Sequence, residues 1–254
     1  MILAGVLGGG LQGCCTAIAL AARKVKVTLF DKNETLLSRA ATANEGKIHL
    51  GYMYAGDPSL STAKTMMAGA LAFAPFLERY LARPGHSFAL SVPAAYIVHR
   101  DSQHSAEDVC AYLETVHQLI NEAAAGRKQA YFGKNLSAPI RHWSTAEKAT
   151  EFDPESTLAA VSTPEVAINP IALAHILREY IAAHPLIEVR CGRTVLGAEI
   201  MRDRICVLSD GRDGHSRDSF DHIHRRVGGY QSGTDGDPSR TNRDAAKLWS
   251  LMEA

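Results

Sequence analysis

The chain has 254 residues, 46% of them hydrophobic and 21% charged, so it is long enough to bury a sizeable core. Lysine plus arginine and aspartate plus glutamate each number 27, which gives a formal net charge of zero. This balance supplies no overall field to attract nucleic acid or an anionic membrane surface. Composition therefore favours a small-molecule partner, and it indicates no oligomeric state.

The five cysteines are odd in number and follow no C-x-x-C spacing, which favours reduced thiols in a cytoplasmic protein. The first 22 residues carry no charge, but they lack the basic start of a secretory signal and are too rich in glycine for a membrane helix. We therefore expect no targeting or transmembrane segment. The histidines do not have metal-ligand spacing, so we also expect no metal site.

The first motif along the chain is a glycine-rich loop that follows the apolar run Met1–Leu7 and precedes a small-residue helix, Cys14–Ala22. Gly8, Gly10 and Gly13 form a G-x-G-x-x-G pattern. In such a loop the first glycine permits the tight turn, the second lets the backbone approach a pyrophosphate, and the third lets the helix pack on the sheet. The spacing predicts the phosphate-binding turn of a Rossmann-like fold.

A second buried strand, Val25–Phe30, follows this helix and ends at Asp31. An acidic residue at this distance from the glycines is where a carboxylate binds the adenosine ribose hydroxyls. This order of elements, in which a strand, a glycine loop, a helix and a second strand are followed by an acidic residue, predicts a dinucleotide site.

Periodicity predicts the remaining elements. Helices are expected over Ser59–Tyr80, with Pro75 inside it, Ala106–Ala125 and Pro170–His184, and strands over Phe88–His99, Thr163–Ile168, Ile187–Cys191, Thr194–Met201 and Arg204–Ser209, with a short strand and a helical turn in Ile140–Phe152. The order predicts an α/β fold. Residues 1–86 and 161–208 would form the nucleotide-binding domain and 87–160 a smaller inserted α+β substrate domain. Residues 209–254 are polar and poor in apolar side chains, which predicts a disordered tail.

Three segments, Val6–Ala22, Val25–Asp31 and Asn44–Gly51, resemble the FAD-dependent oxidoreductases of the D-amino-acid oxidase superfamily. Asn44–Tyr54 is most similar to the N-S-G-x-I-H-x-G segment of the 2-hydroxyglutarate dehydrogenase branch, and the superfamily also contains glycerol-3-phosphate dehydrogenase. The resemblance covers roughly residues 1–208 and is most specific in the first third. It implies FAD as cofactor and a Rossmann-like FAD-binding domain.

The resemblance also implies roles for particular residues. Those expected to contact FAD are Gly8, Gly10, Leu11, Gln12 and Gly13 at the pyrophosphate, Asp31 with the neighbouring Lys32 at the ribose, Arg39 and Ala40 in a phosphate-contacting loop, Asn44, Glu45 and Gly46 beneath the flavin ring, and Val195 at the adenine.

The same resemblance places His49 near the flavin, where an imidazole that titrates near neutral pH can act as a base. The alternative is a histidine that only packs within the loop. Glu45 and Lys47 either contact the cofactor or form a solvated pair.

The implied reaction is oxidation of a CH–OH or CH–NH group of a small hydroxy acid or amino acid, with hydride transfer to the flavin. An NAD(P)-dependent dehydrogenase would use the same glycine loop but would not account for Asn44–Tyr54. Members of the superfamily are longer, and the similarity stops after Ile223. A third interpretation is therefore a C-terminally truncated, non-catalytic remnant.

Overall fold

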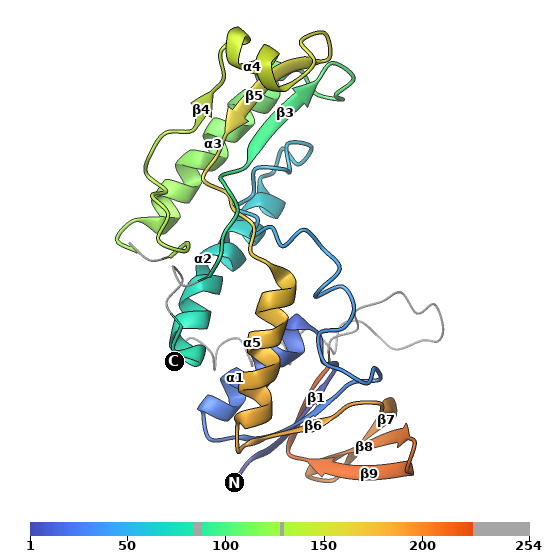
Figure 1. The fold of residues 1–254 in the computed structure, drawn as a ribbon. Coiled ribbons are helices and arrows are strands. Elements are labelled where there is room, and N and C mark those ends of the chain that lie inside the picture. The colour runs from blue at the N-terminus through green and yellow to red at the C-terminus, as the bar shows by residue number, and fades with distance from the viewer. Residues whose placement is uncertain (84–87, 128–129, 226–254) are drawn as a thin grey trace.

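The computed structural model describes residues 1–83, 88–127 and 130–225, and Figure 1 shows their arrangement. A four-stranded parallel sheet lies at one end of an elongated molecule, in the order β10-β1-β2-β6. Its strands are β1 (Leu3–Leu7), β2 (Lys26–Phe30), β6 (Ile187–Arg190) and β10 (His222–Arg225). The predicted α/β class with a Rossmann-like parallel sheet is confirmed.

Two layers cover this sheet. Helices α1 (Leu11–Ala22) and α5 (Pro170–Ala183) lie on one face, and an antiparallel meander of β7 (Thr194–Met201), β8 (Arg204–Gly211) and β9 (Gly214–Phe220) lies on the other. The two layers follow from the alternation of side chains along each strand, because successive residues point to opposite faces of the sheet. Val6 and Leu29 join the core beneath the helices, whereas the next residues, Leu7 and Phe30, join a second core with Val207 and Phe220.

The other end of the molecule contains a three-stranded antiparallel sheet in the order β3-β5-β4, made of β3 (Ala95–His99), β4 (Arg141–His142) and β5 (Thr157–Ser162). Helix α3 (Ala106–Ala124) packs against β5, and α4 (Thr145–Glu151) lies at the tip. The long helix α2 (Ser61–Leu81) contacts both α1 and α3. Leu113 and Val161 belong to the same core cluster as Val6, so one apolar core extends from the parallel sheet into this region.

Local signals explain where several helices begin. The Asn169 side chain accepts hydrogen bonds from the N–H groups of Ile171 and Ala172, and Pro170 occupies the first helical position of α5. At α4, Ser144 and Glu147 form a capping box. The irregular segment 163–169 therefore ends at the cap residue Asn169, where α5 begins.

Two expectations are wrong. Residues 209–225 are not a disordered tail, because they complete β8 and form β9 and β10, with β10 parallel to β1. Their polar composition reflects alternation in β9, where every second residue is exposed. Residues 163–168 are not a strand. They form only isolated bridges, Lys47 with Ala167 and Leu90 with Ile168, while the strand of this region is β5. The rest of the predicted tail, residues 226–254, lies outside the described residues.

Candidate functional site: a dinucleotide loop and a buried carboxylate

Each of the three motif positions is occupied by glycine for a different structural reason. Gly8 has φ +114°, which favours glycine, and its N–H donates to the carbonyl of Phe30 at 2.9 Å. A Cβ on Gly13 would stand 1.8 Å from the Gly8 carbonyl oxygen, so α1 approaches β1 as closely as glycine allows. A Cβ on Gly10 would meet no protein atom within 4 Å. The surroundings of Gly10 are therefore open where the motif predicts pyrophosphate.

The N-terminus of α1 faces this open space. Gly10 is its N-cap and supplies no side chain to bond the first turn, and the Cys14 N–H makes the first return bond, 2.9 Å to the Gly10 carbonyl. Helix geometry leaves the N–H groups of the preceding residues, Leu11, Gln12 and Gly13, without an intrahelical acceptor. Such an end attracts anions, so the residues present fit a pyrophosphate.

Asp31 lies at the carboxyl end of β2, beside the glycine loop. Its Oδ2 accepts the Gly9 N–H at 2.6 Å, and its Oδ1 accepts both the backbone N–H and the side-chain amide of Asn33 at 2.7 Å. The carboxylate thus ties the end of β2 to the loop, a structural role that the sequence did not predict. Oδ2, which accepts only the Gly9 N–H, retains a further lone pair for a ribose hydroxyl.

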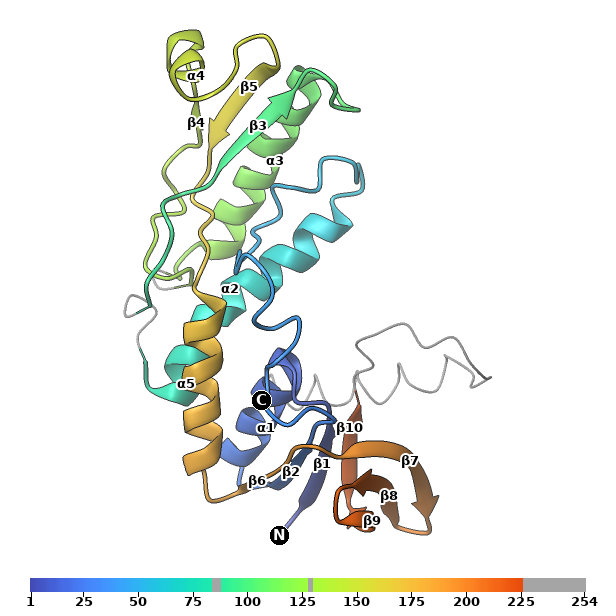
Figure 2. The same ribbon diagram turned by 45° about the vertical axis from the view of Figure 1, so that its right-hand side comes forward.

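The loop after β2 carries the next group of predicted residues. Lys32, Arg39 and Ala40 are exposed. The Arg39 Nε donates to the Asn33 side chain at 3.0 Å, and the Asn44 side chain donates to the Ala40 carbonyl at 2.6 Å. This loop runs from the parallel sheet towards the region of α2 and α3 (Figure 2), so it connects the glycine motif with the segment that contains His49.

The segment Asn44–Leu50 is held against residues 165–168. Gly46 has φ +70°, and a Cβ there would stand 1.9 Å from the Ile168 carbonyl oxygen, so this glycine is required by close packing. The Ile168 N–H donates to the Gly46 carbonyl and the Ile48 N–H to the Val166 carbonyl. The two segments thereby form one unit, although Leu50 and its partner Glu165 lie 115 positions apart in the sequence.

Glu165 is the centre of this unit, and its side chain is fully buried. The Leu50 N–H donates to Oε2 at 2.7 Å, and the Tyr96 hydroxyl donates to Oε1. The Nδ1 of His49 also lies 3.3 Å from Oε1, while its Nε2 lies 4.0 Å from the Glu45 carboxylate. The His49 side chain is 21% exposed, so it lies at the surface of the unit with one nitrogen towards the buried carboxylate.

Tyrosines surround this carboxylate. Burial, reinforced by the charge of Glu165, raises the pKa values of Tyr96 and Tyr52 above the usual range. The Tyr131 hydroxyl donates to the Ile48 carbonyl at 2.6 Å and accepts the Val166 N–H at 3.1 Å. Sequence reasoning missed Glu165, Tyr96 and Tyr131, because their partners are distant in the chain and no spacing signals them.

Val195 lies in β7 and packs against the second core, which contains Leu7 and Phe30 from the ends of β1 and β2. The structure thus groups the glycine loop with Asp31, and Asn44–Gly46 with His49, while Val195 belongs to the meander on the opposite face of the sheet.

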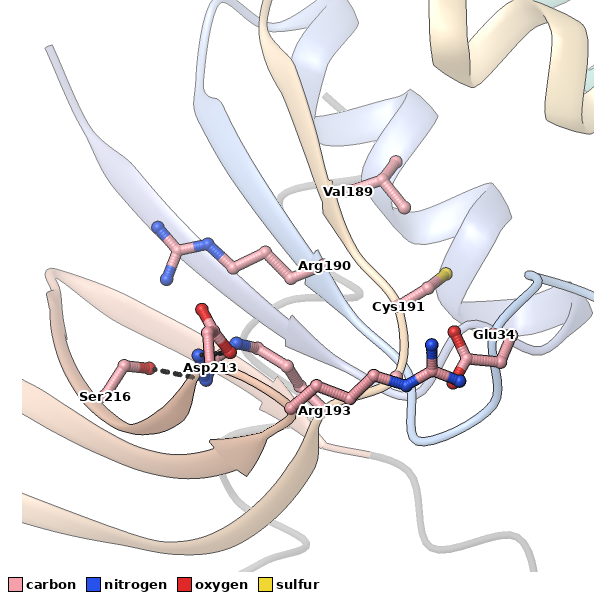
Figure 3. Close-up of a pocket in the computed structure, with 9 residues that line it drawn as sticks. Glu34, Val189, Arg190, Cys191, Arg193, Asp213 and Ser216 are labelled. Carbon is pink, nitrogen blue, oxygen red and sulfur yellow. Dashed lines mark hydrogen bonds and ion pairs between the residues drawn. The ribbon is translucent and has the colours of Figure 1, made fainter.

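Two hollows lie near these residues. One, of about 500 Å³, contains Asn44 and Glu45 and is completed by residues 89–91 and 167–171. The other, of about 550 Å³, lies between β6 and the β8–β9 turn (Figure 3). Its arginines are paired: Arg190 with Asp218, Arg193 with Asp213, and Arg212 with Glu34. The second hollow contains none of the predicted site residues.

Within the described residues no cluster of three histidine, cysteine, aspartate or glutamate side chains is arranged to hold a metal ion. No helix in the same part of the chain is long and apolar enough to cross a membrane.

Comparison with protein-family models matches residues 4–225 to the DAO family, described as FAD dependent oxidoreductase. The tRNA 5-methylaminomethyl-2-thiouridine biosynthesis bifunctional protein MnmC of Pseudomonas aeruginosa (strain UCBPP-PA14) is 28% identical over 192 residues, 75% of this chain and 24% of that protein. The glycerol 3-phosphate oxidase of Mycoplasma pneumoniae is 41% identical over 64 residues, 25% of this chain and 16% of that protein.

Solved structures show the same fold. Glycine oxidase from Geobacillus kaustophilus superposes with a TM-score of 0.60 at 20% identity, covering 88% of this chain and 55% of that one. The FAD-bound, dithionite-reduced L-α-glycerophosphate oxidase from Mycoplasma pneumoniae has a TM-score of 0.58, also at 20% identity, and covers 88% and 53%. The chain therefore spans about half the length of these oxidases.

Proposed function

Because the chain belongs to the DAO family of FAD-dependent oxidoreductases, we propose that it binds FAD and oxidises the CH–OH or CH–NH group of a small hydroxy acid or amino acid. The observation that carries the proposal is the glycine loop. Gly10 faces open space, whereas Gly13 is in contact with Gly8, which is the pattern that a pyrophosphate on the end of α1 requires.

The proposed cofactor contacts follow the strand ends. The first turn of α1 would hold the pyrophosphate, Asp31 with Lys32 the ribose, Arg39 and Ala40 a phosphate, and Val195 the adenine. The segment Asn44–Gly46 would lie beneath the flavin, in support of which Asn44 and Glu45 border a hollow of about 500 Å³. Bound FAD supplies the acceptor for the hydride that leaves the substrate carbon.

His49 is the proposed base. As the C–H bond breaks, the substrate hydroxyl or amine must also lose a proton, and the product is a keto acid or an imine. An imidazole can take this proton near neutral pH. Two observations support this role: the His49 side chain is 21% exposed, and its Nε2 lies 4.0 Å from the carboxylate of Glu45, which belongs to the segment proposed to face the flavin.

The proposed location is the cytoplasm. All five cysteines are free, and the adjacent Cys14 and Cys15 lie inside α1, as suits a reducing compartment.

Turnover tests this function. The protein, supplied with FAD, is assayed against a panel of small hydroxy acids and amino acids, including glycine, and separately against glycerol 3-phosphate, a phosphorylated alcohol, with oxygen or a dye as acceptor. We expect one substrate class to be oxidised. His49→Gln should lower kcat by about 10²-fold, whereas His175→Gln, an exposed histidine on α5, should not change it. FAD binding without turnover of any substrate would favour a non-catalytic remnant, and NAD(P) binding in place of FAD would overturn the proposal.

A further inference from the structure

We propose that Glu165 is a positioning residue that fixes His49 as its Nδ1–H tautomer and so directs the Nε2 lone pair towards the segment Asn44–Gly46. This inference rests on the proposed role of His49 as the base. Glu165 has no place in the sequence motifs, and its fully buried carboxylate lies beside the partly exposed His49.

The first step is to establish that the other two partners of the Glu165 carboxylate, Leu50 and Tyr96, act as hydrogen-bond donors. The Leu50 N–H can only donate, and it donates to Oε2 at 2.7 Å. Because burial and the Glu165 charge raise the pKa of Tyr96, its hydroxyl keeps its proton and donates to Oε1. A backbone bond and a phenol therefore hold the two carboxylate oxygens in fixed directions.

The second step is the tautomer of His49. A carboxylate has no proton to give, so the Nδ1 atom at 3.3 Å from Oε1 forms a hydrogen bond only if it carries the proton. In a neutral imidazole the other nitrogen, Nε2, then has the lone pair. Nε2 lies 4.0 Å from Glu45, so the basic atom faces the segment proposed to lie beneath the flavin.

The third step is rigidity. The Glu165 side chain is fully buried, and its segment is fixed by the bonds that join Gly46 to Ile168 and Ile48 to Val166. The His49 and Tyr54 rings also lie in a T-shaped arrangement, with ring centroids 6.2 Å apart. The ring is consequently held by a hydrogen-bonding carboxylate on one side and an aromatic ring on the other, as a base needs when its orientation limits proton transfer.

A glutamine at position 165 should reverse the tautomer. Its single oxygen must face the Leu50 N–H, which can only donate, so its NH₂ group takes the place of Oε1. That amide donates towards Nδ1, which must then carry the lone pair, and the proton moves to Nε2. Tyr96→Phe is the matched control, because it removes one bond to Glu165 and leaves the carboxylate beside His49.

The experiment is a two-bond ¹⁵N–¹H spectrum of the whole protein with labelled histidine, recorded on the alkaline plateau of the histidine titration. His49→Gln identifies the His49 signals by their loss. We expect protonated Nδ1 in the wild type and in Tyr96→Phe, and protonated Nε2 in Glu165→Gln. A wild-type His49 protonated on Nε2 would overturn the inference even if Glu165→Gln does not fold, and so would an unchanged tautomer in a folded Glu165→Gln. The spectrum needs neither FAD nor substrate, so it is independent of turnover. If His49→Gln retains full kcat, the role of His49 as base fails while the tautomer result stands.

Discussion

Gly13 lies so close to Gly8 that an added Cβ would stand 1.8 Å from the Gly8 carbonyl oxygen. The obstacle is backbone and cannot rotate away. This contact sets the depth at which α1 begins beside β1, and so it sets where the helix end presents its N–H groups.

Gly13→Ala should therefore lower the free energy of unfolding by about 2–3 kcal/mol, as overpacking a tight contact does. Gly10→Ala is the matched control, because its Cβ would enter open space at φ −75°. It should change stability by less than about 1 kcal/mol and yet weaken FAD binding. Denaturant unfolding of both variants checks the pair, and equal losses of stability would contradict the geometry.

Asp31→Asn should also destabilise the protein, before any cofactor is considered. Both carboxylate oxygens accept N–H groups, from Gly9 on one side and Asn33 on the other. An asparagine would turn its NH₂ towards one of these donors, at a cost of about 2 kcal/mol. Glu34→Gln, an exposed change in the same loop, should leave the melting temperature almost unaltered. If the two variants have the same melting temperature, the Asp31 hydrogen bonds between β2 and the glycine loop do not contribute to stability.

Tyr131→Phe should loosen the unit around Glu165. Its hydroxyl bridges the Ile48 carbonyl and the Val166 N–H, so its loss removes a hydrogen bond from each of these backbone groups, of which the Val166 N–H is buried. We expect a loss of about 2 kcal/mol together with faster amide exchange at Val166. Tyr112→Phe, at a tyrosine that is only partly buried and whose hydroxyl donates to the Gly51 carbonyl, should cost less. If Tyr131→Phe leaves the free energy of unfolding unchanged, the hydroxyl bridge does not contribute to stability.

Stability should fall at alkaline pH. Burial raises the pKa values of Tyr52, Tyr96 and Tyr131 in the folded state, and that of Cys15 to about 12. In the unfolded chain the side-chain pKa values are about 10 for tyrosine and about 9 for cysteine. Above these pH values the unfolded chain has lost protons that the folded protein still holds. The unfolded state then binds fewer protons, so the free energy of unfolding decreases as pH rises, by up to about 1.4 kcal/mol per pH unit for each group. Urea unfolding at pH 8 and pH 11 measures this, and equal midpoints would contradict the burial of these side chains.

The first third of the fold could be read from the sequence because its signals are local. Gly8, Gly10 and Gly13 lie within six residues and Asp31 closes the next strand, so spacing alone located the loop. Even there the bond between Asp31 and Gly9 was missed, because a ribose contact and a backbone contact require the same carboxylate.

Pairing between residues distant in the sequence explains why residues 209–225 were predicted as a disordered tail and why Glu165 was missed. β9 is polar because one of its faces is exposed, and β10 joins β1 across almost the whole chain, with Asp221 accepting the Leu3 N–H. Composition cannot distinguish such strands from a disordered tail. Glu165 was missed for the same reason: neither Leu50 nor Tyr96 is near it in sequence.

The central claim is that this chain binds FAD through the glycine loop. The most direct test is the visible absorption spectrum of the protein after incubation with FAD and gel filtration, for the wild type and for Gly10→Glu. We predict a flavin spectrum that remains with the wild-type protein and is lost in Gly10→Glu, because a carboxylate side chain at Gly10 would fill and repel the pyrophosphate space. A wild-type protein that stays colourless, or a Gly10→Glu variant that retains flavin equally well, would contradict the account.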